Sequence, residues 1–128
     1  MRKRLDLSQV LKTYEGDVIK ESNTPGAKGS DAMTLKRVVL NYLRNAGQMG
    51  INDSEQQSAY ELGFVIGSGD KEIIISTSQY DVLKKLADKG KVKNQQGEEI
   101  TIYGIEVKYQ AKEMIDLAED VEEDKKKK

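Results

Sequence analysis

Carboxylate side chains are the catalytic groups that this sequence offers in number. Glu98 and Glu99 precede Tyr103, and Asp53 lies close to Glu55. Such groups support general acid–base chemistry when burial raises the pKa of one carboxyl. Each of these positions lies in a polar stretch, so we interpret them as solvated surface charges. The sequence therefore identifies no catalytic residue.

Histidine and cysteine are both absent from the 128 residues. Their absence removes the side chain that titrates near neutral pH, the usual thiol nucleophile and the commonest transition-metal ligands. The stretch Gly67-Ser68-Gly69-Asp70 follows a predicted helix and lacks P-loop spacing, so we interpret it as a helix-ending turn. The stretch Asn52-Asp53-Ser54-Glu55 lacks the glycine of an EF-hand loop. We therefore expect no enzyme activity, no cofactor and no metal site.

Composition and charge indicate where such a chain resides. The net charge of −1 gives no global attraction to nucleic acid or to an anionic membrane. The lack of cysteine fits a reducing compartment. No apolar run approaches the roughly 18 residues that span a bilayer, and the basic start is not followed by a hydrophobic signal core. We expect a cytoplasmic protein with no membrane partner.

The length predicts a single small globular domain over residues 1–121. Residues 22–33 contain the only proline and almost nothing to bury, which predicts a mobile loop. Residues 122–128 are charged throughout and predict a disordered tail.

Apolar residues recur at helical spacing in four segments. Thr34 is the expected N-cap of the clearest helix, and Gly47 is expected to close it in the left-handed region. A second helix is expected to begin with Asp53 as its cap and Gln56 at capping-box spacing. Gly63 lies inside this second helix, where it costs about 1 kcal/mol relative to alanine; it indicates either close packing against another backbone or a weaker helix.

The remaining helices lie in the second half of the chain. Ser76 or Thr77 caps the third, with Gln79 at capping-box spacing from Ser76, and Gly90 ends it. The last is expected to run from about residue 102 to 121, capped by Thr101. Its acidic end opposes the helix dipole and should fray.

Extended structure is predicted in short pieces. Residues 5–21 predict either a short helix from Ser8, then a tight turn at Gly16 and a strand, or a tight turn at Gly16 between two extended pieces. Glu72–Ser76 is either a strand or an extended segment laid across the helices, and residues 91–99 are a polar loop or a weak hairpin. The predicted fold is mainly α (α+β), with about four helices and one or two short strands or a hairpin. The expected core comprises Leu35, Val38, Val39, Tyr42, Leu43, Leu62, Ile66, Ile74, Leu83, Leu86, Val107, Ala111, Met114 and Ile115.

Tyrosines and basic side chains are the candidates for partner contact. Tyr42, Tyr60 and Tyr80 fall on or beside apolar stripes and are expected in the core, whereas Tyr14 and Tyr103 lie near turns and are expected to be exposed interface anchors. Basic residues gather on the solvent side of the first strong helix and at the end of the third. These residues are Lys36, Arg37, Arg44, Lys84, Lys85, Lys89, Lys91 and Lys93.

A wider pattern runs through the chain. The stretch Leu7 to Ile19 (LSQVLKTYEGDVI) is followed, after a variable loop, by Met33 to Val39 (MTLKRVV), and a strand-helix segment and a glycine-led helix from Gly104 come later. This arrangement resembles small uncharacterised proteins of tailed bacteriophages. The resemblance implies a viral origin, a place in the host cytoplasm and a small interaction protein, with no catalytic residues to carry over.

Taken together, these features predict a non-enzymatic protein-interaction module, phage-encoded, that docks to a host or virion protein. The alternative is a nucleic-acid-binding regulator that uses the lysine-rich helix 77–89 and the loop after it. The order of elements argues against a winged helix, because a strand-like segment stands where the second of two successive helices should be. Self-association into a homo-oligomer is open for either function.

Overall fold

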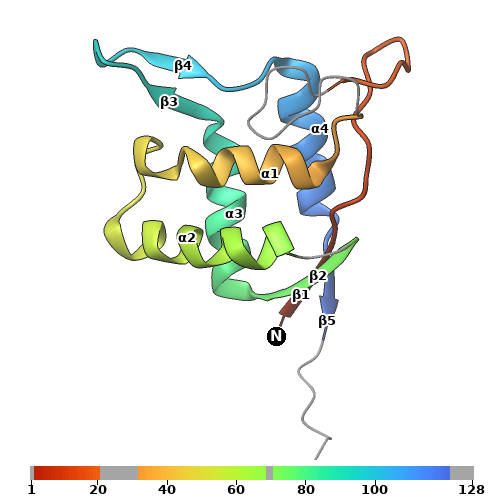
Figure 1. Cartoon of the computed structure of the whole chain (residues 1–128), viewed down its shortest axis with the longest axis horizontal. Helices are drawn as coiled ribbons and strands as arrows, with labels where there is room; N and C mark the ends of the chain where they lie inside the picture. Colours follow the sequence, from red (N-terminus) through yellow and green to blue (C-terminus); the bar gives the residue numbers. More distant parts are fainter. Residues whose placement is uncertain (1, 21–31, 69–70, 122–128) are drawn as a thin grey trace, which may run out of the picture.

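The computed structural model describes residues 2–20, 32–68 and 71–121 (Figure 1). Within these ranges the chain is an α+β protein with four α-helices and short antiparallel strands, as predicted. The helices are α1 (Leu35–Arg44), α2 (Asp53–Ser68), α3 (Thr77–Lys89) and α4 (Ile105–Asp116), with a 3-10 turn, η1 (Ala46–Gln48), after α1. The strands are β1 (Arg2–Asp6), β2 (Glu72–Ser76), β3 (Lys91–Lys93), β4 (Glu99–Thr101) and β5 (Glu119–Val121).

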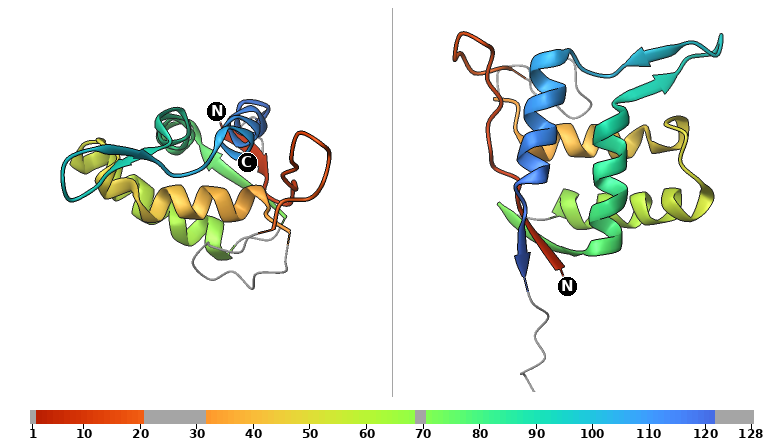
Figure 2. Two further views of the ribbon diagram at one scale, coloured as in Figure 1. Left: turned by 90° about the horizontal axis from the view of Figure 1, so that it is seen from above. Right: turned by 180° about the vertical axis from the view of Figure 1, so that it is seen from behind.

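The helices form two layers that run across one another. α1 and α2 lie side by side in one layer, and α3 and α4 lie in the other, with the β2-β1-β5 sheet at one end and the β3–β4 hairpin projecting at the opposite end (Figures 1 and 2). The core lies between the layers, where each helix contributes its apolar stripe. Its fully buried large side chains include Leu35, Val38, Val39, Tyr42, Leu62, Ile66, Leu83, Leu86 and Ile115.

Local capping signals account for several helix ends. The Thr34 side chain accepts from the Arg37 backbone N–H at 3.4 Å and begins α1. Ser76 and Gln79 form the predicted capping box of α3, which ends at Gly90 with φ of 55°. Each of these signals was predicted, because a cap depends on residues adjacent in sequence.

Other helix ends differ from prediction. α1 ends at Arg44 and is followed by η1, so Gly47 does not close it. The glycine with positive φ in this region is Gly50. Asn52, rather than Asp53, caps α2, because Asn52 and Glu55 exchange backbone-to-side-chain hydrogen bonds. The last helix begins after Gly104 and ends at Asp116. The predicted helix over 102–121 with a Thr101 cap is therefore wrong at both ends.

The sheet resolves the open question about Glu72–Ser76, which is strand β2. It pairs antiparallel with β1, so that Leu5 faces Ile73 and Lys3 faces Ile75. Side chains alternate between the faces of a strand. Ile73 and Ile75 are therefore buried, whereas Ile74 is 44% exposed on the other face. The prediction of Ile74 as a core residue is wrong by one position in register.

Neither β1 nor β5 was predicted: residues 2–4 were interpreted only as a basic start, and residues 119–121 were assigned to the end of the last helix. Arg4 lies between Glu72 and Glu119, at 3.9 and 3.4 Å, and Lys3 pairs with Asp120 at 2.5 Å. The basic start and the acidic end thus neutralise one another across adjacent strands. The end of the predicted last helix is consequently a strand instead of a fraying helix terminus.

The predicted short helix from Ser8 does not form. Leu7 and Leu11 are buried, and the Leu11 N–H donates to the Met33 carbonyl at 3.0 Å. Pairing with distant backbone replaces the helical hydrogen bonds. The turn at Gly16, with φ of 91°, follows the prediction, and the antiparallel bridge between Lys12 and Val18 agrees with the alternative of two extended pieces on either side of it. Of the predicted mobile loop 22–33, residues 22–31 lie outside the described residues, while Met33 is buried. The tail 122–128 also lies outside them.

The predicted core is confirmed in its helical part. Leu43 and Met114 are half-buried at its edge. Residues missed by helical periodicity reach the core from loops and from β1 and β2. They include Leu5, Leu7, Leu11, Met33, Met49, Ile51, Ile73 and Ile75.

Candidate functional site

The two carboxylate pairs considered for catalysis lie on different elements. Glu98 and Glu99 are exposed on the β3–β4 hairpin, and Asp53 is exposed at the start of α2. Within residues 2–20, 32–68 and 71–121, no three acidic side chains gather in a way that could hold a metal ion. The features of interest are instead two surfaces, one aromatic and one basic.

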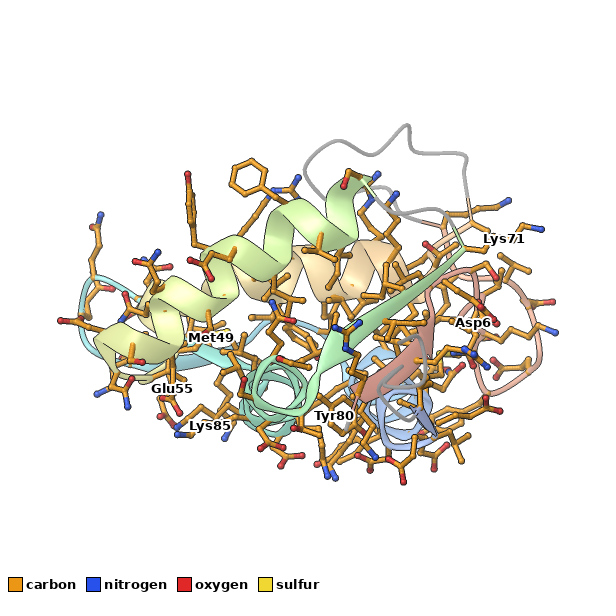
Figure 3. The ribbon with its side chains drawn as sticks, turned by 90° about the horizontal axis from the view of Figure 1, so that it is seen from below. Asp6, Met49, Glu55, Lys71, Tyr80 and Lys85 are labelled. Atoms are coloured by element: carbon orange, nitrogen blue, oxygen red, sulfur yellow. The ribbon has the colours of Figure 1, made fainter. Side chains whose placement is uncertain are left out.

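Glu55 is held by two hydrogen bonds. Its Oε2 accepts from Lys85 Nζ at 2.7 Å, and its Oε1 accepts from the Asn52 backbone N–H at 3.0 Å. Figure 3 shows Glu55 and Lys85 together between α2 and α3. The hydrogen bond from Lys85, followed by that from the Asn52 backbone, holds the pKa of Glu55 below its ordinary value of 4.5.

This depressed pKa predicts an acid-sensitive contribution to stability. A group whose pKa is lower in the folded state stabilises the fold above its unfolded pKa and loses that effect as pH falls. Glu55→Gln should therefore unfold at lower urea concentration than wild type at neutral pH, with the difference shrinking below about pH 4.5. Urea titrations followed by circular dichroism at several pH values measure this difference.

Lys85→Gln serves as the matched control, because it removes the same hydrogen bond from the other side. It should give a pH dependence of the same direction but smaller size, because Glu55 keeps its hydrogen bond from the Asn52 backbone, and the double variant should add little to Glu55→Gln. A difference between Glu55→Gln and wild type that stays constant down to pH 3 contradicts the assignment.

The predicted contact lysines of α3 and β3 divide into two groups. Lys84 faces Asp116 at 3.8 Å and the Tyr80 ring at 5.7 Å, and Lys85 is held by Glu55. These two were predicted as partner contacts, but their charges are paired with acidic side chains of the protein itself. Lys89, Lys91 and Lys93 form no ion pair with any residue in the described ranges.

These unpaired lysines line a cleft of about 730 Å³. We call it the lysine cleft: its walls are Lys89 at the end of α3, Lys91 and Lys93 on β3, Lys108 on α4, and the backbone of residues 47–50. Asp88 and Glu99 also line the cleft, but Asp88 pairs with Lys112 at 3.2 Å. The sequence predicted three of the lysines and missed Lys108, which only helix packing brings to the site.

Glycines position two of the cleft lysines. Gly90 takes a φ of 55°, and a Cβ there would lie 2.9 Å from Lys108 Cε. Gly50 takes a φ of 81°, and a Cβ there would lie 3.4 Å from Lys89 Nζ. Both positions favour glycine, and the missing side chains leave room for the lysines to lie over the backbone.

The other predicted contact residues have mixed outcomes. Tyr14 is 79% exposed, as expected. Tyr103 is half-buried instead: its ring meets that of Tyr42 edge-on at 5.7 Å, and its hydroxyl accepts from Asn41 at 3.0 Å. Of the predicted contact residues on α1, Lys36 and Arg37 are half-buried and Arg44 is exposed.

An aromatic pair on α2, Tyr60 and Phe64, lies on the surface, and the prediction that places Tyr60 in the core is wrong. Tyr60 was expected in the core, yet Tyr60 and Phe64 are 66% and 64% exposed. Their rings stack edge-on with centroids 5.1 Å apart. Ala59, Leu62 and Ile66 fill the buried face of α2. The i, i+4 spacing of two aromatic residues beside that stripe is the signal that was available in the sequence.

A groove of about 230 Å³ lies beside the pair, between α1 and α2. We call it the aromatic groove. It is lined by Leu40, Leu43, Arg44, Ala59, Tyr60, Gly63 and Phe64. Exposed apolar surface of this kind, rimmed by a charged side chain, is typical of protein interaction sites.

Comparison with known proteins gives no assignment: no family model, no curated protein and no solved structure matches the chain. The resemblance to tailed-phage proteins therefore stays a prediction. No helix in the described ranges has the length and apolar character required to cross a membrane.

Proposed function

We propose that this chain is a non-enzymatic interaction module that docks to a partner protein through the aromatic groove. The observation that carries the proposal is the exposure of Tyr60 and Phe64, stacked on one another at the rim of an apolar depression. Burying a large exposed aromatic side chain against a partner removes a large apolar surface from water, which contributes more favourable free energy than burying a smaller side chain. If the chain is phage-encoded, the partner is a host or virion protein.

The groove suits an amphipathic helix. It lies between two antiparallel helices, a geometry that binds a third helix through apolar anchors. Leu40 and Leu43 offer apolar contact from α1. Arg44 is exposed at the rim and forms no ion pair with a described residue, so it favours a carboxylate on the incoming helix.

Gly63 supports this interpretation. It lies inside α2, where glycine costs about 1 kcal/mol relative to alanine. A Cβ at Gly63 would meet nothing within 4 Å, so packing within the described protein does not require glycine there. The bare backbone instead permits close approach of a partner at the groove.

The test begins with capture of partners from cells by wild-type protein, followed by titration of the purified partner. Tyr60→Ala and Phe64→Ala are each expected to weaken binding by about 2 kcal/mol or more, roughly 30-fold, as for central aromatic anchors. Tyr14→Ala is the matched control, because Tyr14 is as exposed but lies outside the groove. It should change the affinity less than about twofold.

Gly63→Ala separates binding from stability. It should raise the free energy of unfolding by up to about 1 kcal/mol, because alanine is the better helix former. At the same time it should lower the affinity for the partner. Equal affinity of all the variants for the partner contradicts the proposal. Concentration-dependent dimers that Phe64→Ala abolishes also contradict it, since a second copy would then occupy the groove.

A further inference from the structure

We infer that the lysine cleft binds the phosphodiester backbone of a nucleic acid. This inference is independent of the aromatic groove, which is formed by α1 and α2 and shares no lining residue with the cleft. It assigns a second surface, with a different chemistry, to the region where the hairpin, the end of α3, α4 and residues 47–50 meet.

The first argument is the charge that remains in the cleft. Lys89, Lys91, Lys93 and Lys108 line it, and none forms an ion pair with another residue of the described ranges. Lys108 lies over the Tyr109 ring at 5.2 Å, a contact that keeps its charge. Asp88 pairs with Lys112, and Glu99 lies opposite Lys93 in the β3–β4 pair, so the lining holds two acidic side chains against four lysines. Glu55, outside the lining, also attracts Lys89. The net charge of the whole chain, −1, conceals this local excess.

The second argument is placement. Lys91 and Lys93 alternate with Val92 and so share one face of β3, on a hairpin that projects from the helical layers (Figures 1 and 2). Lys89 and Lys108 lie at its base, over Gly50 and Gly90. Positive charge thus extends from the helix ends along the hairpin, which is the shape required to follow a chain of phosphates.

The third argument concerns the class of ligand. Among the described residues that line the cleft none is aromatic, and its apolar members are the buried Met49 and the half-buried Val92. Protein interfaces favour aromatic and arginine anchors and are depleted of lysine. Lysine without apolar anchors instead favours a point-charge contact with phosphate. Phosphate contacts carry no sequence information, so we expect binding without base specificity.

The test is fluorescence anisotropy with labelled duplex and single-stranded DNA of mixed sequence, at several salt concentrations. Wild type should bind at low salt, and the logarithm of its association constant should fall against the logarithm of salt concentration with a slope near −3 for duplex, as expected for three or four phosphate contacts. Lys91→Glu/Lys93→Glu should weaken binding at least about tenfold. Because both residues are exposed, this variant should retain the wild-type circular dichroism spectrum.

Lys12→Glu/Lys20→Glu is the matched control. It makes the same change in net charge on the exposed segment beyond α4, away from the hairpin (Figure 2). It should bind DNA within about twofold of wild type. No binding of either DNA at low salt overturns the inference, as does an equal loss in the control. Equally tight binding of polyglutamate through the same lysines also overturns it, since the ligand would then be an acidic protein.

Discussion

Replacing Ile75 by alanine is expected to lower the free energy of unfolding by about 2–5 kcal/mol, the usual loss for a buried isoleucine. The same change at Ile74 is expected to cost less than about 1 kcal/mol, mostly through strand propensity. The two residues are adjacent in β2, but Ile75 is 2% exposed and faces Lys3 in β1, whereas Ile74 is 44% exposed and faces Arg4. Denaturant unfolding of both variants measures the difference.

Ile74→Thr and Ile75→Thr extend this comparison with a polar side chain of similar branching. The hydroxyl reaches water at position 74 and is buried at position 75, so only Ile75→Thr should be strongly destabilising. Equal losses at both positions, or the larger loss at Ile74, would contradict the register of β1 against β2, because a slip of one residue exchanges the two faces.

Two buried tyrosines are expected to respond oppositely to removal of the hydroxyl. Tyr42 is fully buried, and its hydroxyl has no hydrogen-bond partner among the described residues. Burial also raises the pKa of this phenol far above its ordinary value of 10.0, so the group stays neutral. Tyr42→Phe should leave the free energy of unfolding unchanged or raise it by up to about 1 kcal/mol, because it removes an unpaired buried oxygen.

Tyr80 provides the matched comparison. Its hydroxyl donates to the Ile115 carbonyl at 2.7 Å, which ties α3 to the end of α4. Tyr80→Phe should lower the free energy of unfolding by about 1 kcal/mol. Tyr42→Ala should lower the free energy of unfolding by about 3–5 kcal/mol, because removing the ring leaves a cavity in the core. Calorimetry or urea unfolding checks all three variants, and a loss for Tyr42→Phe as large as that for Tyr80→Phe would show that the Tyr42 hydroxyl is hydrogen-bonded.

The two candidate surfaces differ in how far the sequence predicted them. Lys89, Lys91 and Lys93 are close in sequence, so their clustering was visible before the fold was known. Their separation from Lys84 and Lys85 was not, because it depends on acids carried by α2 and α4. The aromatic groove was missed because Tyr60 lies beside the apolar stripe of α2, and periodicity alone does not decide which aromatic side chain is covered.

The sequence by itself determined the helices and several of their caps. Thr34, Ser76 and Gly90 cap helices through residues within a few positions of them, so these helix ends can be predicted from local sequence. The helical half of the core followed from the same short-range periodicity.

Only the tertiary structure decided the sheet and the surfaces. Residues 2–6 become a strand because residues 72–76 and 119–121 supply their backbone and charge partners. The same long-range pairing fixed which isoleucine of β2 is buried, and the packing of α4 brought Lys108 to the lysine cleft. Contacts between segments far apart in sequence produce no periodic pattern in either segment. They therefore cannot be predicted from the local pattern of a single sequence.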